Sequence, residues 1–251
     1  MPTYSYSRLN AFENCPYQYK LRYIDCIKVE RDTIERFLGN TVHSTLEYLY
    51  KDMLKGNKRE LEMVLKLYRW YWEKDFNKNI VIVKRQYGVD HYRKIGEKCI
   101  ERYYGKHFPF NKNKILGLEE KISIKVDKEG KYALTGVVDR IDETPDGIIE
   151  IHDYKTGMTL PSQQGIEKET QLALYQVGLR DKYGNEKQID LVWHYLMFGH
   201  EFVLRKTDDQ LDVAIKKTVE IIERVENTKD FPPKKGPLCN YCDYYEGECK
   251  A

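Results

Sequence analysis

Four cysteines stand at the two ends of this 251-residue chain. Cys15 lies near the N-terminus, whereas Cys239, Cys242 and Cys249 all lie within the last thirteen residues. If the four sulfurs bind one metal centre, the two ends of the chain must meet, and a fold that keeps them apart is excluded. The sequence therefore predicts a structure whose ends are joined by a sulfur-ligated metal site.

The spacing of these cysteines does not identify the metal. A Cys-x-x-Cys pair such as Cys239 and Cys242 suits zinc and an iron-sulfur cluster equally well. A zinc ribbon would need a second local Cys-x-x-Cys pair, and the sequence contains none. The spacing of the six cysteines is too uneven for a disulfide framework. We expect Cys26 and Cys99 to be bystanders that take no part in the metal site. A link from Cys15 to Cys239 would destabilise the unfolded chain by roughly 5 kcal/mol, because it limits the conformations of that chain. We therefore expect the metal site to stabilise the fold rather than to act as a redox catalyst.

The bulk composition argues against a membrane-spanning protein and against a secreted one. No apolar run approaches the roughly 20 residues that a membrane span requires, and the chain does not start with a signal-peptide pattern, so we expect a cytoplasmic protein without membrane contact. The formal net charge is only +2. A charge this small provides no global field that attracts nucleic acid, so any DNA contact must use local patches.

The hydrophobic periodicity changes near residue 108, from helical spacing to strand-like alternation. The predicted helices are 5–24 (broken at Cys15–Pro16 and capped by Ser5 or Ser7), 33–54, 58–78, 89–107, 166–183 and 208–226, and the predicted strands are 115–126, 132–141, 148–154, 191–198 and 201–205. We therefore expect an α/β fold in one domain, residues 1–251. It would comprise a helical N-terminal region (1–108), a sheet-containing core (109–228) and a cysteine-rich C-terminal segment (229–251).

A pair of acids and a lysine mark the predicted sheet. Asp153 and Lys155 are two residues apart on one strand, so both side chains leave the same face. Asp139, on the preceding strand, is as far from Asp146 in the turn as Asp153 is, which makes the two acids cross-strand neighbours with Cβ atoms about 5 Å apart. Two carboxylates this close repel unless a cation lies between them, and hard oxygen ligands favour Mg²⁺ or Mn²⁺. An isolated Asp-x-Lys is more often an ordinary surface ion pair, however.

The surrounding residues favour the catalytic alternative. The sequence places Gly136-Val-Val-Asp139 before the turn, Asp153-Tyr-Lys155 after it, and Gln171-x-x-x-Tyr175 on the next predicted helix. Together with the cysteine pattern, this resembles the PD-(D/E)XK nuclease superfamily in its RecB-like branch, and in particular its AddB-like members. The resemblance covers almost the whole chain.

The resemblance implies a role for each residue. Asp139 and Asp153 would be the two metal-binding acids, with Asp153 standing where many relatives carry glutamate, and Lys155 would orient or deprotonate the attacking water. Gln171 and Tyr175 would lie beside the cleft. Gly39-x-x-x-His43 matches a helical motif that supplies a further metal ligand, His43, although such a histidine taken alone is more often structural. Either Glu119 or Glu120 is a weaker candidate for the same site.

The resemblance also implies a fold, cofactors and partners. The fold would be a restriction-endonuclease-like core, a mixed central sheet flanked by helices, with residues 109–228 as its catalytic part. The four terminal cysteines would bind a 4Fe-4S cluster, with zinc as the alternative, although the spacing from Cys242 to Cys249 is one residue longer than the pattern. The catalytic metal would be Mg²⁺ or Mn²⁺. No nucleotide-binding Gly-x-x-x-x-Gly-Lys-Ser occurs, so any helicase would be a separate chain.

Three functions are compatible with these patterns. The first is a metal-dependent DNA exonuclease in repair, recombination or end processing, acting on single-stranded DNA or DNA ends. The second is a non-catalytic DNA-binding or scaffold subunit that partners a helicase or CRISPR-adaptation proteins. The third is a zinc-stabilised structural domain with fortuitous acids. The presence of Asp139, Asp153 and Lys155 favours the first.

Overall fold

The computed structural model describes residues 3–127 and 130–249, and it is built around a six-stranded mixed sheet. The strands follow the order β1-β5-β6-β7-β8, and β4 also pairs with β5. The β1/β5 and β6/β7 pairs are parallel, and the other pairs are antiparallel. This confirms the mixed central sheet expected from the sequence. The strands are β1 (Thr3–Ser5), β4 (Lys114–Lys125), β5 (Ala133–Glu143), β6 (Ile149–Lys155), β7 (Ile189–Tyr195) and β8 (His200–Leu204).

The sheet forks at β5. Strand β4 pairs with β5 along nearly its whole length. On the other edge, β1 pairs with residues 133–135 and β6 pairs with residues 140–143. Within the described chain, residues 136–139 therefore have no strand partner on that edge. Asp139 lies at the point where the sheet opens.

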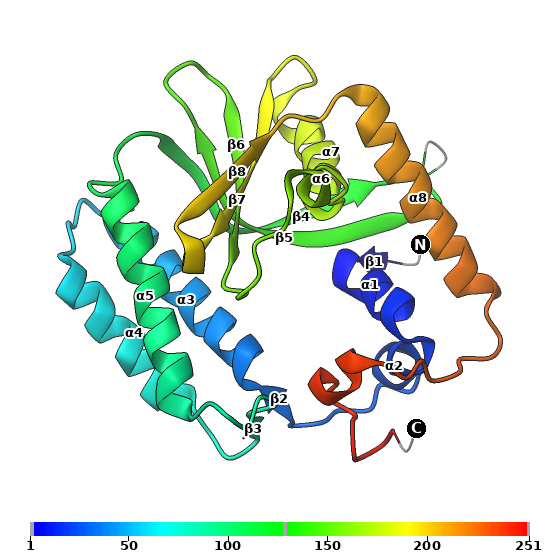
Figure 1. Ribbon diagram of the computed structural model, residues 1–251. Helices are drawn as coiled ribbons and strands as arrows, with labels where there is room; N and C mark the ends of the chain where they lie inside the picture. Colours follow the sequence, from blue (N-terminus) through cyan, green and yellow to red (C-terminus); the bar gives the residue numbers. More distant parts are fainter. Residues whose placement is uncertain (1–2, 128–129, 250–251) are drawn as a thin grey trace.

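Helices cover the sheet as two groups with separate hydrophobic cores. One core joins the sheet to α1, α7 and α8, and the other joins α3, α4 and α5 to the far side of β6 and its neighbours (Figure 1). Ile34, Leu38, Val42 and Leu46 of α3 are almost fully buried, as their helical spacing predicts. The helices are α1 (Tyr6–Asn14), α2 (Pro16–Tyr19), α3 (Ile34–Leu54), α4 (Leu61–Asp75), α5 (Val89–His107), α6 (Gln163–Glu167), α7 (Gln171–Tyr183) and α8 (Asp208–Asn227).

Local signals set most helix ends. The Ser5 side chain accepts a hydrogen bond from the backbone nitrogen of Arg8 and caps α1, and Pro16 opens α2, since proline fits the first turn of a helix. A π-helical turn, Lys20–Ile24, follows directly. Thr33 caps α3, and Thr207 forms a capping box at the start of α8. These helices confirm the sequence-based expectation within a few residues.

Two expectations were wrong in detail, and one strand was missed. The single helix predicted over 166–183 is two helices, because the Glu169 carboxylate accepts hydrogen bonds from the backbone nitrogens of Gln171 and Leu172 and so starts α7 afresh. The strand predicted over 191–198 ends at Tyr195, and the chain turns back through Gly199, whose φ of 59° suits glycine. Strand β1 was not predicted, since three residues are too few to show periodicity.

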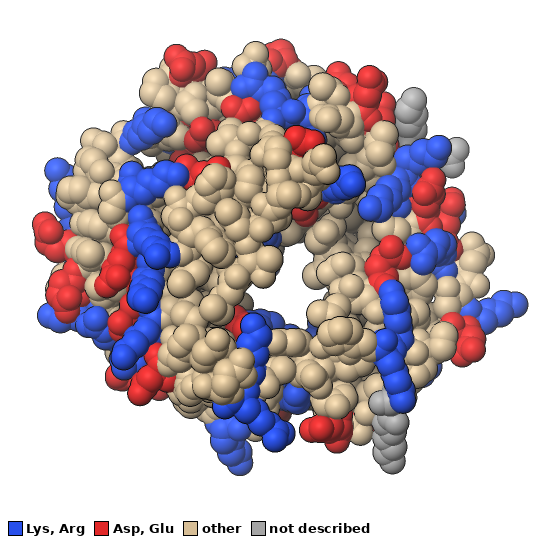
Figure 2. All heavy atoms as spheres, in the orientation of Figure 1, with Lys and Arg blue, Asp and Glu red and all other residues tan. Residues whose placement is uncertain are grey.

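The N-terminal and C-terminal segments meet on one side of the molecule. A 3₁₀ turn, Pro237–Tyr241, lies beside α2 and close to the short parallel pair β2 (Asp32–Thr33) and β3 (Ile80–Val81) (Figure 1). The helices and strands are thus arranged as a ring, and Figure 2 shows an opening through its middle. Strand β5, α1 and α3 border this opening. None of the helices in the described residues is long and apolar enough to cross a bilayer.

Candidate active site

Asp139 and Asp153 face each other across the β5–β6 hairpin. The ladder pairs Ile141 with Ile151 and Arg140 with His152, so one further step places Asp139 opposite Asp153. Directly opposed residues of an antiparallel pair point to the same face. The arrangement that the symmetry about the turn predicts is therefore present.

The environment of Asp153 is unfavourable for a negative charge. Burial and the nearby charge of Asp139 raise the pKa of its carboxyl to about 6, although Lys155 opposes both. Lys155 Nζ lies 2.7 Å from Asp153 Oδ2. This ion pair offsets part of the cost of burying the Asp153 carboxylate.

His43 reaches this pair from α3. Its Nε2 lies 2.8 Å from the backbone oxygen of Tyr154, and its Nδ1 lies 3.4 Å from Asp139 Oδ2. Burial alone would lower the pKa of His43, but the contacts with Asp139 outweigh it and raise the pKa to about 9. Gly39, one turn earlier, lets α3 approach the end of β6: a Cβ there would lie 3.3 Å from Thr156 Oγ1. This is the physical reason for the Gly-x-x-x-His spacing.

Glu119 completes the group from β4. Because Leu118 pairs with Arg140 and Glu120 with Val138, Glu119 lies opposite Asp139. Its φ of 47° is unusual for a residue with a side chain. Burial and the charge of Asp139 raise the pKa of Glu119 to about 7.

The two glutamates named as weaker candidates lie in different environments. Glu119 contributes a ligand atom to a group in which the ligand atoms of His43, Glu119 and Asp139 all lie within 4.8 Å of one another. Glu120 forms an ion pair with Lys182 instead. Asp153 is not part of the 4.8 Å group. Of the two, only Glu119 is placed to share a cation with Asp139.

These residues fit a divalent cation. Three carboxylates stand on adjacent strands, and the pKa values of Glu119 and Asp153 are raised by burial and by the charge of Asp139. A cation would relieve each of these costs, since like charges this close otherwise force protonation. Carboxylate oxygens with one imidazole suit Mn²⁺, and the carboxylates alone suit Mg²⁺.

A cleft of about 1000 Å³ reaches this group through Lys155, the ion-pair partner of Asp153. Lys155, Gln171 and Tyr175 line it, together with Ser5 and Asn10 from the N-terminal region. Gln171 Nε2 donates a hydrogen bond of 3.1 Å to Tyr175 Oη. The structure thus places both predicted α7 residues on the wall of the same cleft as Lys155.

Tyr175 packs directly on the fork of the sheet. A Cβ added at Gly136 would lie 2.3 Å from Tyr175 Cε1, a distance that no side chain tolerates. Glycine at this position therefore lets the ring lie against β5.

The four terminal cysteines line one cavity of about 50 Å³. The backbone nitrogens of Lys234 and Gly236 donate hydrogen bonds of 3.3 and 3.4 Å to the sulfurs of Cys15 and Cys239. Burial raises the pKa of Cys242, and the charges of Cys15 and Cys249 raise it further, which indicates that the sulfurs converge. Cys26 is exposed and Cys99 is buried in the helical core, so neither lines the cavity.

The spacing of the sulfurs bears on the metal. Within residues 3–127 and 130–249, the groups of three or more ligand atoms that lie within 4.8 Å of one another contain no cysteine. Four sulfurs around one tetrahedral zinc, with bonds of about 2.3 Å, would be about 3.8 Å apart. In the described residues, the sulfurs are therefore not preassembled as a tetrahedral zinc site.

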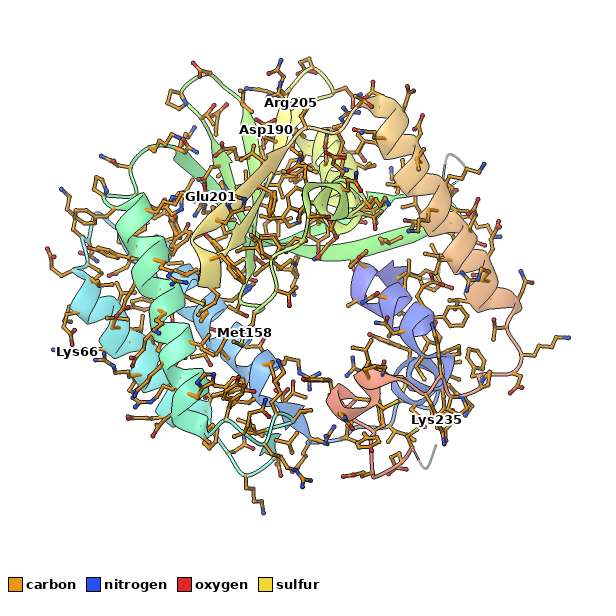
Figure 3. All side chains as sticks on the ribbon, viewed as in Figure 1. Lys66, Met158, Asp190, Glu201, Arg205 and Lys235 are labelled. Atoms are coloured by element: carbon orange, nitrogen blue, oxygen red, sulfur yellow. The ribbon has the colours of Figure 1, made fainter. Side chains whose placement is uncertain are left out.

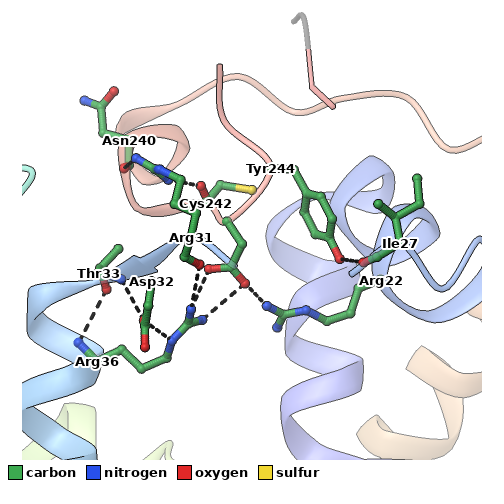
Figure 4. Close-up of polar contacts among 10 residues, drawn as sticks. Arg22, Ile27, Arg31, Asp32, Thr33, Arg36, Asn240, Cys242 and Tyr244 are labelled. Carbon is green, nitrogen blue, oxygen red and sulfur yellow. Dashed lines mark hydrogen bonds and ion pairs between the residues drawn. The ribbon is translucent and has the colours of Figure 1, made fainter. Parts of the chain in front are cut away.

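An ion cluster that the sequence did not reveal lies beside this cavity (Figure 4). The buried Asp243 carboxylate lies between Arg22 and Arg36, and Arg36 Nη2 is 2.7 Å from Asp243 Oδ1. Arg31 donates hydrogen bonds to the backbone oxygens of Cys242 and Asn240. The C-terminal segment is thereby tied to the π-helical turn that follows α2 and to α3. The only signal in the sequence is an acid directly after Cys242.

Comparison with known proteins places these features in a family. A model of the PD-(D/E)XK nuclease superfamily matches residues 3–246. The chain is 24% identical over 261 residues to an ATP-dependent helicase/deoxyribonuclease subunit from Alkaliphilus metalliredigens, covering 90% of this chain, and 25% identical over 166 residues to a protein of the same name from Streptococcus uberis, covering 62%. It spans only 21% and 14% of the lengths of these relatives.

A solved structure shares the fold. A candidate exonuclease from Eubacterium rectale superposes with a TM-score of 0.50 at 15% sequence identity. The match covers 98% of this chain and 93% of that chain. At this identity the likeness concerns the arrangement of helices and strands, and it agrees with the mixed sheet described above.

Proposed function

This chain belongs to the PD-(D/E)XK nuclease superfamily, and we propose that it hydrolyses phosphodiester bonds in DNA, from strand ends, with Mg²⁺ or Mn²⁺. The observation that carries this proposal is the opposition of Asp139 and Asp153 across the hairpin, with the Lys155 ammonium 2.7 Å from Asp153. A cation site beside a lysine in an open cleft is what metal-assisted hydrolysis requires.

We assign the cation to His43, Glu119, Asp139 and Asp153. When bound, a divalent ion polarises a phosphoryl oxygen and stabilises the charge that develops on the leaving oxygen. The four residues come from α3, β4, β5 and β6, so four separate elements fix the position of the ion.

Lys155 acts as a hydrogen-bond donor in this proposal. Burial would lower the pKa of its ammonium, but the ion pair with Asp153 outweighs burial and raises it. The side chain is therefore charged in the resting protein, and it orients a water or a phosphate oxygen in the cleft. Gln171 and Tyr175, on the same wall, provide further donors for phosphate oxygens.

The ring shape supports action on strand ends. The opening in Figure 2 is bordered by β5 and α1, the elements that also line the cleft. A strand that enters such an opening must do so by its end, whereas an internal site cannot reach it without a free terminus. Met158 lies at the edge of the opening (Figure 3) and is 45% exposed, so it offers an apolar contact for a base.

We further propose that the four cysteines hold a 4Fe-4S cluster. The convergence of the four cysteines on one cavity and the two backbone N–H···S contacts support this assignment. Since the curated relatives are named as helicase/deoxyribonuclease subunits, a helicase is the partner that we propose, and single-stranded DNA is the substrate it would supply.

The test uses labelled single- and double-stranded DNA, blocked at either terminus, incubated with the full chain and Mn²⁺. We expect the wild-type protein to degrade strands with a free end and to leave strands blocked at both ends intact. Lys155→Ala should abolish degradation, and Asp146→Ala, an exposed acid in the turn of the same hairpin, should not. Binding without cleavage by the wild-type protein would instead support a scaffold role.

A further inference from the structure

A second group of ligand-type side chains lies away from the cleft, where the helical region meets β7 and β8. His107 ends α5, His194 lies on β7 and Glu201 lies on β8. Figure 3 shows Glu201 on β8, on the side that faces α5. The ligand atoms of the three side chains all lie within 4.8 Å of one another. The proposed nuclease mechanism uses none of them.

The contacts within this group converge on a shared point. His194 Nδ1 lies 2.9 Å from Glu201 Oε1 and His107 Nε2 lies 2.8 Å from the same oxygen. Both imidazoles therefore meet the same carboxylate oxygen, and His107 Nε2 is buried.

The protonation states of His194 and Glu201 are those of metal ligands. Burial lowers the pKa of His194 well below its usual value and keeps the imidazole neutral. Burial would raise the pKa of Glu201, but its contacts with His107, His194 and Lys106 outweigh this and lower the pKa far below the usual value. A neutral imidazole and an ionised carboxylate are the forms that bind metals.

The group also has an outer layer of polar partners. His194 Nε2 lies 2.9 Å from His152 Nδ1, and His152 Nε2 lies 3.3 Å from Asp142 Oδ2. All three of these side chains are buried. On the other side, Lys106 Nζ lies 2.9 Å from Glu201 Oε2. Ligating histidines characteristically contact such partners through their second nitrogen, which fixes the ring and the tautomer.

The space available fits one ion. A cavity of about 10 Å³, lined by all three side chains, is roughly the size of one water molecule. Ligand atoms of a tetrahedral site with bonds of about 2.0 Å are roughly 3.3 Å apart. The distances of 2.8 and 2.9 Å from Glu201 Oε1 to the two imidazoles are thus about half an ångström shorter than in such a site. The side chains of His107 and Glu201 are 23% and 22% exposed, which leaves a path for entry.

We propose that His107, His194 and Glu201 bind one transition-metal dication of the zinc class, which ties the end of α5 to β7 and β8. Water or a further side chain completes the coordination. Two imidazoles and a carboxylate favour zinc over Mg²⁺, whose ligands are mostly oxygen. His152 neighbours Asp153 on β6, and its side chain points to the opposite face of the sheet. The proposed zinc site therefore lies behind the strand that carries Asp153 and Lys155.

The test separates this site from the cysteines and the acids. In full-length protein carrying Asp139→Asn and Cys242→Ser, we expect equilibrium dialysis against Zn²⁺ followed by metal analysis to find a zinc ion that is lost when His107→Gln is added. His91→Gln, on the first turn of the same helix, is the matched control and should retain it. We expect at least tenfold weaker zinc binding in the His107 variant.

A second variant and a second readout distinguish the loss of a metal ligand from misfolding of the protein. Glu201→Gln keeps the shape of the side chain and should lose the zinc-dependent rise in melting temperature. Co²⁺ should give visible bands from imidazole and carboxylate ligation that persist in the cysteine variant and vanish with Glu201→Gln. The proposal is overturned if His107→Gln and Glu201→Gln bind as much zinc as the parent, or if the parent binds none.

Discussion

The carboxylate of Asp139 accepts a hydrogen bond of 2.8 Å from the backbone nitrogen of Tyr154. This bond ends the β5–β6 ladder, since the strands separate beyond it at the fork. It also holds the Asp139 side chain towards β6, so the acid that anchors the hairpin is the one shared with His43 and Glu119. Fold and site therefore depend on the same carboxylate.

Asp139→Asn separates these two roles. The amide oxygen of asparagine can still accept the hydrogen bond from Tyr154, but the charge that binds a cation is lost. We expect Mn²⁺ at about 100 times its dissociation constant to stabilise the wild-type protein by about 2.7 kcal/mol, which raises the melting temperature by roughly 5–10 °C. The variant should show little of this rise in a thermal melt with and without Mn²⁺, and an equal rise would disprove the metal assignment.

Lys155→Met tests the role of the ammonium. Methionine fills much of the same space but cannot donate a hydrogen bond, so we expect the cleavage rate to fall by about a thousandfold. DNA binding in the presence of Ca²⁺ should change little, because other residues line the cleft. The measurement is single-turnover cleavage of end-labelled single-stranded DNA. A rate within tenfold of wild type would exclude Lys155 from the reaction.

The cysteine cavity predicts a selective loss of colour and stability. Cys242→Ser should bleach the absorbance of an iron-sulfur cluster and lower the unfolding free energy by about 3 kcal/mol, since a link between distant residues would be lost. Cys26→Ser is the control, because Cys26 is exposed and lies outside the cavity. The checks are an absorbance spectrum after anaerobic purification and a urea titration. Unchanged colour would refute the cluster.

Thiol labelling offers a pH-dependent test of the remaining cysteines. Burial raises the pKa of Cys99 to about 12. The thiolate reacts and the thiol does not, so at pH 8 the reactive fraction of Cys99 should be about a thousandfold below that of an ordinary cysteine. Cys26 should be alkylated first. Mass spectrometry after a short pulse of iodoacetamide at pH 8 and pH 9.5 measures both, and rapid labelling of Cys99 at pH 8 would contradict its burial.

These predictions differ in how far the sequence alone supports them. The opposition of Asp139 and Asp153 follows from a local hairpin, because one turn around Asp146 fixes the register of both strands. The choice of Glu119 over Glu120 depends instead on how β4 pairs with β5. A shift of that register by one residue would exchange the two side chains, and no local pattern specifies it.

Residues brought in by tertiary packing were harder to predict. His43 meets Asp139 only because Gly39 lets α3 approach β6, and the resemblance to the family, not the helical periodicity, pointed to it. Asp243 and Glu201 carried no signal, since Asp243 pairs with Arg36 and Glu201 with His107, both distant in the sequence. The break between α6 and α7 results from one side chain, Glu169, acting as a cap in place of the usual small residues.

Asp243→Asn tests whether the ion cluster holds the ring together. Asparagine leaves Arg22 and Arg36 without their shared counter-ion. Since both arginines are about a third exposed or more, we expect a loss of about 2 kcal/mol rather than the larger cost of a fully buried pair. Asp230→Asn, at an exposed position, is the control. Urea unfolding measures the loss, and an unchanged midpoint would show that the C-terminal segment is held by the cysteines alone.

Gly136→Ala tests the contact between the fork and α7. The added methyl group would lie 2.3 Å from Tyr175 Cε1, so either the ring or β5 must shift, and we expect a cost of about 1–3 kcal/mol. Tyr175→Leu removes the ring edge, and the double variant should therefore lose less stability than the two single variants together. Such coupling, measured by a double-mutant cycle in urea, is expected only for residues in contact. Because Asp139 lies three residues further along β5, a shift of that strand should also weaken Mn²⁺ binding by Gly136→Ala and leave it near normal in the double variant. Additive losses, or Mn²⁺ binding that stays low in the double variant, would show that Tyr175 does not set the position of the fork.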